Sequence, residues 1–520
     1  MKERFTYCIL ILSTILVYGN VINGVFLYDD IILIKNNPFI KSLQNIPLFF
    51  VENPTNYGGI IRSNFYRPNQ HIINSILYFF FEYNTKPYHI FSIFLHLLNS
   101  ILIYKILKGG LKFTPDAALL STLLFIVHPI NSEAISYVSG VSDPLALFFI
   151  LLGTYIDFKK RNLLFFLPVI FILGLTSKEI AVVFPLIMLL IEIVLFKVEL
   201  KTKKCLIIHF INFLILGVYL WAKFTIFNFT SFLGLSDDVN VGLIKRIINF
   251  IGTLPEYLKT LIYPIDLYIE KPMNLYDSWD KFNVILGVLL IILITVTLFK
   301  AILKSNNRII IACSWLAITL FPYTGIIRLN ANFLEHWFYI PFFGILILLS
   351  TFYDKYIIGR RIKSVLVVLL VLFGGRTIIR NIEWSSPELF YKNELRYSPN
   401  SKRMNNNLGN IYLNEDKFNL AQESYLKVLK IDPNNITALF NMSIVYIRLK
   451  KESKAEELLL KIVDKKPDMI NAYVLLYLIY KDYQILKREK LISLINKIAI
   501  EGNRSIIKKD LEFLFEGNIK

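Results

Sequence analysis

The chain has 520 residues, of which 55% are hydrophobic and only 18% charged. This composition excludes an ordinary soluble globular protein and indicates a polytopic membrane protein. The formal charge of +18 does not indicate nucleic acid, because the basic residues lie largely in short clusters between apolar segments, so anionic lipid is the favoured partner.

Apolar segments long enough to cross a ~30 Å hydrocarbon core recur from the N-terminus to about residue 380. The first resembles a signal peptide, but no small-residue cleavage site follows, so we interpret it as a retained helix. We predict eleven transmembrane helices, at about residues 5–22, 88–107, 116–134, 143–158, 162–177, 180–197, 205–223, 282–300, 308–327, 337–353 and 363–380.

The loops between these segments predict the orientation of the chain. With a cytoplasmic N-terminus, every basic cluster falls on the cytoplasmic side. The stretch 243–264 is broken by Pro255 and carries charges, and a crossing there would move two basic clusters outside. We therefore expect 224–281 to be one external region with interfacial or re-entrant helices, like the external loop 24–87. The C-terminal domain then lies on the external face of a multi-pass protein of the cytoplasmic membrane.

The C-terminal part of the chain is charged and contains an internal repeat. Pro399, Pro433 and Pro467 recur at one constant interval, which equals the tetratricopeptide period of about 34 residues. Ala421 and Ala455 take matching places, where a small residue lets two helices approach. We predict an all-α protein with a transmembrane domain at 1–380, a capping helix at 381–401, tetratricopeptide repeats at 402–503 and a tail at 504–520, the repeats presenting a surface to a peptide or protein.

Two adjacent carboxylates, Asp29 and Asp30, follow the first apolar segment. One interpretation is that they mark the water boundary. The other is that one of them is a general base that takes the proton of an attacking hydroxyl, supported by the second acid.

Other ionisable residues also lie near the external ends of the predicted spans, where they are costly unless they pair or function. Cations there could bind a phosphate, although snorkelling and headgroup contact would also explain them. The candidate phosphate-binding residues are Arg67, Lys178, Arg328 and His336, and the candidate substrate-binding residues are His128, Glu133, Asp143, Glu179 and Glu335.

A metal site is not predicted. His128, Glu133 and Asp143 carry atoms that could bind a metal, but helix capping also explains them, and a divalent ion through the carboxylates is not indicated by the spacing. Cys8, Cys205 and Cys313 lie far apart in apolar stretches, which suggests neither a disulfide nor a metal-ligand motif.

The chain resembles the transmembrane-and-tetratricopeptide glycosyltransferases, a branch of the GT-C membrane superfamily, over almost its whole length. The matching motifs are Tyr28-Asp29-Asp30 with Asn37-Pro38, Tyr66-Arg67-Pro68, His128-Pro129 through Glu133-Ala134 to Gly140 and Asp143, Lys178-Glu179, and Glu335-His336 followed by Tyr339-Ile340-Pro341. The resemblance implies transfer of a sugar from a polyprenyl-phosphate donor to a polypeptide or glycan acceptor on the non-cytoplasmic face. Family members attach mannose to Ser or Thr hydroxyls, with an acid of the first loop as the base.

Two positions depart from the family pattern. Val141 stands where the family usually has Arg after the glycine of the second-loop motif, and Trp337 stands where it often has Arg after Glu-His. Because of these departures, the resemblance does not fix which sugar is transferred. Two other functions compete with the enzyme: a non-catalytic membrane scaffold that displays the repeats to partner proteins, and a transporter or flippase, for which the membrane domain shows no repeated halves.

Overall fold

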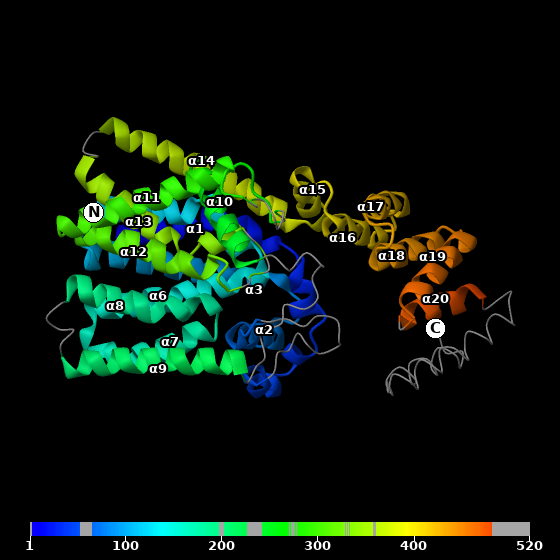
Figure 1. Ribbon diagram of the computed structural model, residues 1–520, viewed down its shortest axis with the longest axis horizontal. Helices are drawn as coiled ribbons and strands as arrows, with labels where there is room; N and C mark the ends of the chain where they lie inside the picture. Colours follow the sequence, from blue (N-terminus) through cyan, green and yellow to red (C-terminus); the bar gives the residue numbers. More distant parts are fainter. Residues whose placement is uncertain are drawn as a thin grey trace. The chain divides into compact units, whose positions relative to one another are not determined.

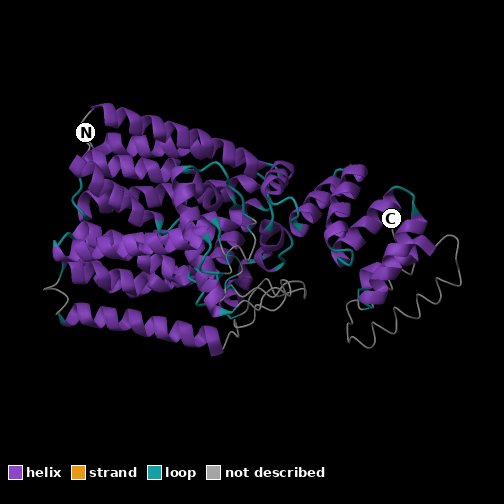
Figure 2. Ribbon diagram, turned by 45° about the horizontal axis from the view of Figure 1, so that its top comes forward, coloured by secondary structure: helices purple, strands orange, loops and turns teal. Residues whose placement is uncertain are grey.

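The computed structural model describes residues 3–51, 65–196, 202–225, 242–269, 271, 276, 278–327, 329, 331, 333–356, 360–467 and 469–480. Every regular element in this part of the chain is a helix, and Figure 2 shows no strand there, so the all-α prediction is confirmed. The chain divides into two compact units, Met1–Leu389 and Phe390–Lys520.

Each of the eleven predicted spans contains a helix (Figure 1). Among the described residues, six helical stretches are long and apolar enough to cross a membrane, and the pair formed by α4 and the residues after it, bent by 52°, would be a seventh. The number of eleven crossings therefore stays a prediction. The helices in the eleven predicted spans are α1 (Glu3–Tyr18), α3 (Thr85–Lys105), α4 (Pro115–Val127), α6 (Ser142–Lys159), α7 (Leu167–Leu175), α8 (Phe184–Leu195), α9 (Lys203–Thr225), α11 (Phe282–Leu303), α12 (Asn307–Leu320), α13 (Phe342–Tyr356) and α14 (Arg360–Ser385).

The bend after α4 has a local cause. His128 precedes Pro129, and the residue before a proline is disfavoured in the helical region. His128 adopts an extended backbone, and the chain resumes in a short 3-10 turn and α5 (Ser132–Ser136). The break is followed by residues 131–143, which link α4 to α6 and are all buried, and α5 within this stretch packs against α3 and α14.

In the described part of the first unit, two longer helices, α2 and α10, lie outside the predicted spans. α2 (Pro68–Phe81) begins directly after Arg67, with proline at its first position, as helix starts favour. α10 (Leu243–Ile262) contains Pro255 and packs Ile248 and Ile251 against Val284 of α11. α10 does not meet the criteria for a membrane span, and its placement as an interfacial helix stays a prediction.

The first external loop is packed, where it is described, by an apolar cluster of its own. Ile34, Ile40 and Phe49 from the loop bury against Tyr88 of α3 and Val138. Because Val138 belongs to the segment that leads into α6, this cluster holds the aspartate pair of the loop against that segment.

The second unit contains helix pairs with the predicted period. α15 (Pro387–Tyr397) is followed by α16 (Lys402–Asn414), α17 (Phe418–Ile431), α18 (Ile436–Arg448), α19 (Glu452–Lys465) and α20 (Ile470–Tyr480). The starts of α16, α18 and α20 are separated by the same interval as the three prolines, and so are the starts of α17 and α19. Residues 481–503 of the third repeat and the tail at 504–520 lie outside the described residues.

Small and large residues alternate where the paired helices meet. Gly409 of α16 lies so close to Tyr425 of α17 that a Cβ on Gly409 would be 2.5 Å from that ring. Ser443 takes the place of Gly409 in the next pair, where the smaller Leu459 replaces Tyr425. Ala421 and Ala455 are fully buried, as the repeat alignment predicts.

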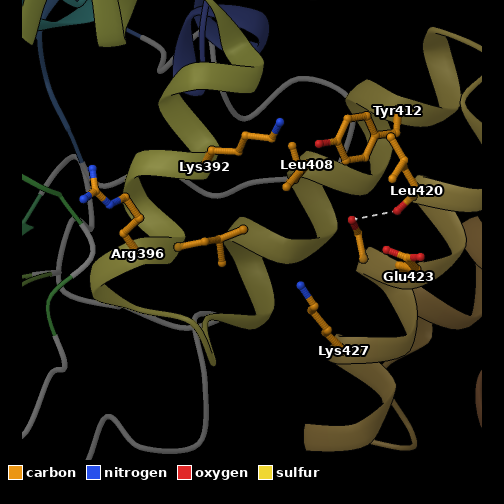
Figure 3. Close-up of a pocket in the computed structure, with 9 residues that line it drawn as sticks. Lys392, Arg396, Leu408, Tyr412, Leu420, Glu423 and Lys427 are labelled. Atoms are coloured by element: carbon orange, nitrogen blue, oxygen red, sulfur yellow. Dashed lines mark hydrogen bonds between the residues drawn. The ribbon is translucent and has the colours of Figure 1, made fainter. Parts of the chain in front are cut away.

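A groove of about 280 Å³ runs between α15, α16 and α17 (Figure 3). Leu408 and Tyr412 contribute apolar and aromatic surface to it, and the lining also carries three cations and one carboxylate. The lining therefore combines apolar side chains with an excess of positive charge. The residues that line it are Lys392, Leu395, Arg396, Leu408, Tyr412, Leu420, Glu423, Ser424 and Lys427.

Candidate active site

The two aspartates of the first loop have different environments. Asp30 is buried, with 1% of its surface exposed, whereas Asp29 is exposed. The Leu27 N–H donates to Asp30 Oδ2 at 3.0 Å, and the N–H and hydroxyl of Ser139 both donate to Oδ1, the N–H at 2.8 Å. Tyr28 has a positive φ of 53°, which turns the chain sharply between these contacts. Asp30 therefore anchors the loop, and Asp29 is presented outward.

The backbone of Asp29 is also held. Its N–H donates to the hydroxyl of Tyr137 at 3.1 Å, and Tyr137 stacks on Trp384 of α14. A carboxylate on a fixed backbone at an exposed position can accept a proton from a group that approaches from outside.

Burial raises the pKa of Asp30 to about 7, although the hydrogen bonds from Leu27 and Ser139 act in the opposite direction. An unfolded aspartate titrates near pH 4, so between about pH 4 and pH 7 the folded state holds the extra proton. The free energy of unfolding should therefore fall as the pH rises through this window, by up to about 1.4 kcal/mol per pH unit.

This dependence can be measured by thermal unfolding in detergent at about pH 5 and about pH 8. The Asp30→Asn variant should show a flatter dependence than the wild type, since its side chain does not titrate. Equal pH dependence in the two proteins would show that Asp30 does not carry the effect.

Arg67 lies at the start of α2, beside the turn that precedes α8. Its Nε is 3.2 Å from Glu179 Oε2, and its Nη1 donates to Ser142 Oγ at 3.4 Å. The Tyr66 N–H donates to the other oxygen of Glu179 at 3.0 Å. The Arg67 side chain keeps 18% of its surface exposed, so the guanidinium can still contact an anion from outside.

Lys178 forms the most enclosed ion pair of the group. Its Nζ is 2.6 Å from Asp143 Oδ2, with the two side chains 7% and 1% exposed. His336 is held by Glu133 at two points. Its ring nitrogen Nδ1 is 2.8 Å from Glu133 Oε1, and its backbone N–H donates to Glu133 Oε2 at 2.9 Å. The other ring nitrogen, Nε2, is 4.0 Å from the Asp143 oxygen that pairs with Lys178. His336 is 17% exposed, which leaves it more accessible than Lys178.

One short segment, 137–143, touches most of these residues. Tyr137 binds the backbone of Asp29, Ser139 binds Asp30, Ser142 binds Arg67, and Asp143 binds Lys178 and lies near His336. The partners come from elements that are remote from this segment along the chain. The structure thus brings together Asp29, Asp30, Arg67, Glu133, Asp143, Lys178, Glu179 and His336.

The remaining predicted site residues have other surroundings. His128 caps the turn after α4: its Nδ1 accepts from the Ile130 N–H at 3.2 Å, and its Nε2 lies 3.0 Å from the Leu261 carbonyl. This geometry is that of a structural residue. Glu335 is buried, and its Oε1 lies 3.8 Å from Arg380 Nη2. Arg328 lies outside the described residues.

Sequence reasoning missed several residues of this cluster. Tyr137, Ser139 and Ser142 are common residue types whose role follows only from their contacts. Arg380 gave a usable signal, because an arginine at the end of an apolar span is costly unless it is paired. It is fully buried, 2.8 Å from Glu383 and 3.8 Å from Glu335.

The two departures from the family pattern are occupied by packed apolar side chains. Val141 is 3% exposed and packs with Leu95 and Leu145. Trp337 is 6% exposed and stacks on Tyr323, with ring centroids 4.8 Å apart. These positions contribute packing rather than charge in this chain.

The fold and the site define a helical membrane protein with a buried ion-pair cluster beside an exposed carboxylate, followed by tetratricopeptide-like helix pairs. A family model of the tetratricopeptide repeat matches residues 402–435. A protein O-mannosyl-transferase of Caenorhabditis elegans is 24% identical over 433 residues, which cover 80% of this chain and 61% of that protein.

Two mammalian relatives match over shorter stretches. Protein O-mannosyl-transferase TMTC4 of Mus musculus is 33% identical over 169 residues, 29% of this chain and 22% of the relative. TMTC1 of Homo sapiens is 30% identical over 145 residues, 27% of this chain and 16% of the relative. The chain thus spans less than two thirds of the length of these relatives. Their names confirm the resemblance to the transmembrane-and-tetratricopeptide mannosyltransferases.

Proposed function

We propose that this protein is an integral-membrane glycosyltransferase that transfers a sugar from a polyprenyl-phosphate donor to an acceptor hydroxyl on the non-cytoplasmic face. The observation that carries the proposal is the exposed carboxylate of Asp29 on a loop that is anchored, through Asp30, to the segment 137–143. The same segment contacts Arg67 and Lys178. An exposed carboxylate and two cationic side chains therefore lie around one short stretch of chain, which supports the proposal.

In the proposed reaction, Asp29 takes the proton of the acceptor hydroxyl as its oxygen attacks the anomeric carbon. The bond between that carbon and the phosphate oxygen breaks, and polyprenyl phosphate leaves with the electron pair. This single displacement inverts the anomeric configuration. Asp29 then releases its proton to water, and no metal ion is needed to balance the step.

Arg67 and His336 are the proposed phosphate contacts. Both keep part of their side chain exposed, whereas Lys178 is enclosed by Asp143 and acts mainly as a positioning residue. A guanidinium can bind two phosphate oxygens at once and stabilise the charge that develops on the leaving group.

The acceptor is proposed to be a Ser or Thr hydroxyl of a polypeptide and the sugar mannose, on the strength of the relatives' names. The repeat unit would hold the acceptor chain or a partner protein, and its basic groove offers one surface for this contact (Figure 3). Asp29 and the repeats then need to face the same compartment, which the predicted topology provides.

The test is a transfer assay with the full-length chain in lipid nanodiscs. Polyprenyl-phosphate mannose and a Ser/Thr-containing polypeptide should give a product heavier by one hexose, whereas a nucleotide-linked mannose should give none. Arg67→Lys keeps the charge but loses the two-point geometry, so we expect the KM for the lipid donor to rise about tenfold.

Arg308→Lys is the matched control, because Arg308 is ion-paired with Asp354 at the same 3.2 Å but lies away from the candidate site. It should leave the KM unchanged. A folded wild type that transfers no hexose from any polyprenyl-phosphate sugar would favour a scaffold instead.

A further inference from the structure

A second cluster of reactive side chains lies outside the candidate active site. Glu192 on α8 meets Cys205 and His209 on α9, and one ligand atom from each lies within 4.8 Å of the other two. The three residues are 1%, 3% and 7% exposed. Cys205 and His209 are four residues apart and therefore share one face of α9. All three side chains converge in the interior between two helices.

We propose that Glu192, Cys205 and His209 bind a zinc ion that fastens α9 to α8. A thiolate sulfur, an imidazole nitrogen and a carboxylate oxygen are all established zinc ligands, and a water would complete the tetrahedron. Around tetrahedral zinc, one sulfur, one nitrogen and one oxygen ligand lie about 3.3–3.6 Å apart, so the side chains need to close by up to about 1.5 Å.

A second observation points to a ligand at this place. Nδ1 of His209 is buried without a hydrogen-bond partner. A buried polar nitrogen without a partner is costly, and burial without compensation is uncommon in folded proteins. A zinc ion bound by the imidazole of His209 would supply the missing partner and fix the orientation of the ring.

The charges around the cluster suit a divalent ion. Arg161 Nη1 is 3.0 Å from Glu192 Oε1 and 2.9 Å from Asp157 Oδ1. Two carboxylates and a Cys205 thiolate carry three negative charges, and the guanidinium and a zinc ion carry three positive charges. The five groups then sum to zero, which lowers the cost of burying them. The competing arrangement is a Cys205 thiol hydrogen-bonded to Glu192 with no metal.

The role of the proposed ion is structural. Asp157 is near the opposite end of α6 from Asp143, and fourteen helical residues span about 21 Å. The cluster is therefore remote from the candidate active site. α9 packs against α7 and α8, and Figure 1 shows α7 directly beside it. The ion would hold the first two turns of α9 in place.

The experiment is zinc analysis of the full-length protein, purified in detergent with an affinity tag that does not bind metals. After gel filtration in metal-free buffer, we expect about one zinc per chain by mass spectrometry of the element. Cys205→Ser and His209→Gln should retain less than a fifth of that amount. Cys313→Ser is the matched control, since Cys313 is also buried but lies on α12, and it should retain the zinc.

Cobalt substitution of the wild type gives an independent measurement. Co²⁺ should produce thiolate-to-cobalt absorption and the visible bands of tetrahedral cobalt, and a chelator should lower the unfolding temperature of the wild type. Wild-type protein that takes up neither zinc nor cobalt would overturn the proposal. So would variants that retain as much zinc as the wild type, because the metal would then be bound elsewhere. Loss of folding in one variant leaves the cobalt measurement on the wild type decisive.

Discussion

Replacing Asp29 by Asn is expected to reduce the rate of sugar transfer by a factor of about 10² to 10⁴, the usual contribution of a general base. Asparagine has nearly the same shape but cannot take the proton of the acceptor hydroxyl. Because Asp29 is exposed and its structural contact to Tyr137 uses the backbone N–H, the fold should persist. The measurement is the initial rate of hexose transfer, with thermal unfolding of the same sample as the folding control.

Asp30→Asn serves as the comparison. It should lower the stability as well as the rate, because an amide can accept only through one oxygen while three donors face the Asp30 carboxylate. Unchanged transfer in Asp29→Asn, Asp30→Asn and the double variant would remove both residues from the mechanism. A rate loss in Asp30→Asn alone, with normal stability, would exchange the two proposed roles.

Replacing Lys178 by Met is expected to destabilise the protein by about 3–5 kcal/mol, the usual cost of removing one partner from a buried ion pair. The change leaves Asp143 buried, with His336 Nε2 at 4.0 Å as a nearby group that can compensate in part. The free energy of unfolding can be compared in detergent by denaturant titration. The double variant Lys178→Met with Asp143→Leu should recover most of the loss, since it removes both charges.

Lys363→Met is the matched control for this prediction. Lys363 is paired with Asp116 at 2.9 Å, but the two side chains are 42% and 59% exposed. Exposed pairs of this kind contribute at most about 1 kcal/mol. If Lys178→Met lowers the free energy of unfolding no more than Lys363→Met does, the ion pair of Lys178 with Asp143 does not hold the turn before α8 to α6.

Much of the architecture could be predicted from local patterns. Apolar segments of sufficient length marked a helix in all eleven predicted spans, and the constant spacing of Pro399, Pro433 and Pro467 predicted helix pairs that recur at the same interval. The motifs also selected most of the ionisable residues of the site cluster, because ionisable groups beside apolar segments are rare enough to be noticed. His128 was included for the same reason, but its contacts are those of a cap.

The proposed zinc ligands illustrate the opposite case. Glu192 and Cys205 are thirteen residues apart and lie on different helices, so no motif spacing marks them. Only the packing of α9 on α8 brings them together.

Composition, apolar segment length and repeat period were sufficient for the helical membrane class and the repeat domain, because these properties depend on near neighbours in the chain. The different environments of Asp29 and Asp30 were decided by tertiary structure. They depend on Ser139, 109 residues away from Asp30, which holds one of two adjacent carboxylates in the interior and leaves the other exposed. The pairing of Arg67 with Glu179 and of His336 with Glu133, over 112 and 203 residues, was decided in the same way, because contacts at such separations leave no periodic trace in a single sequence.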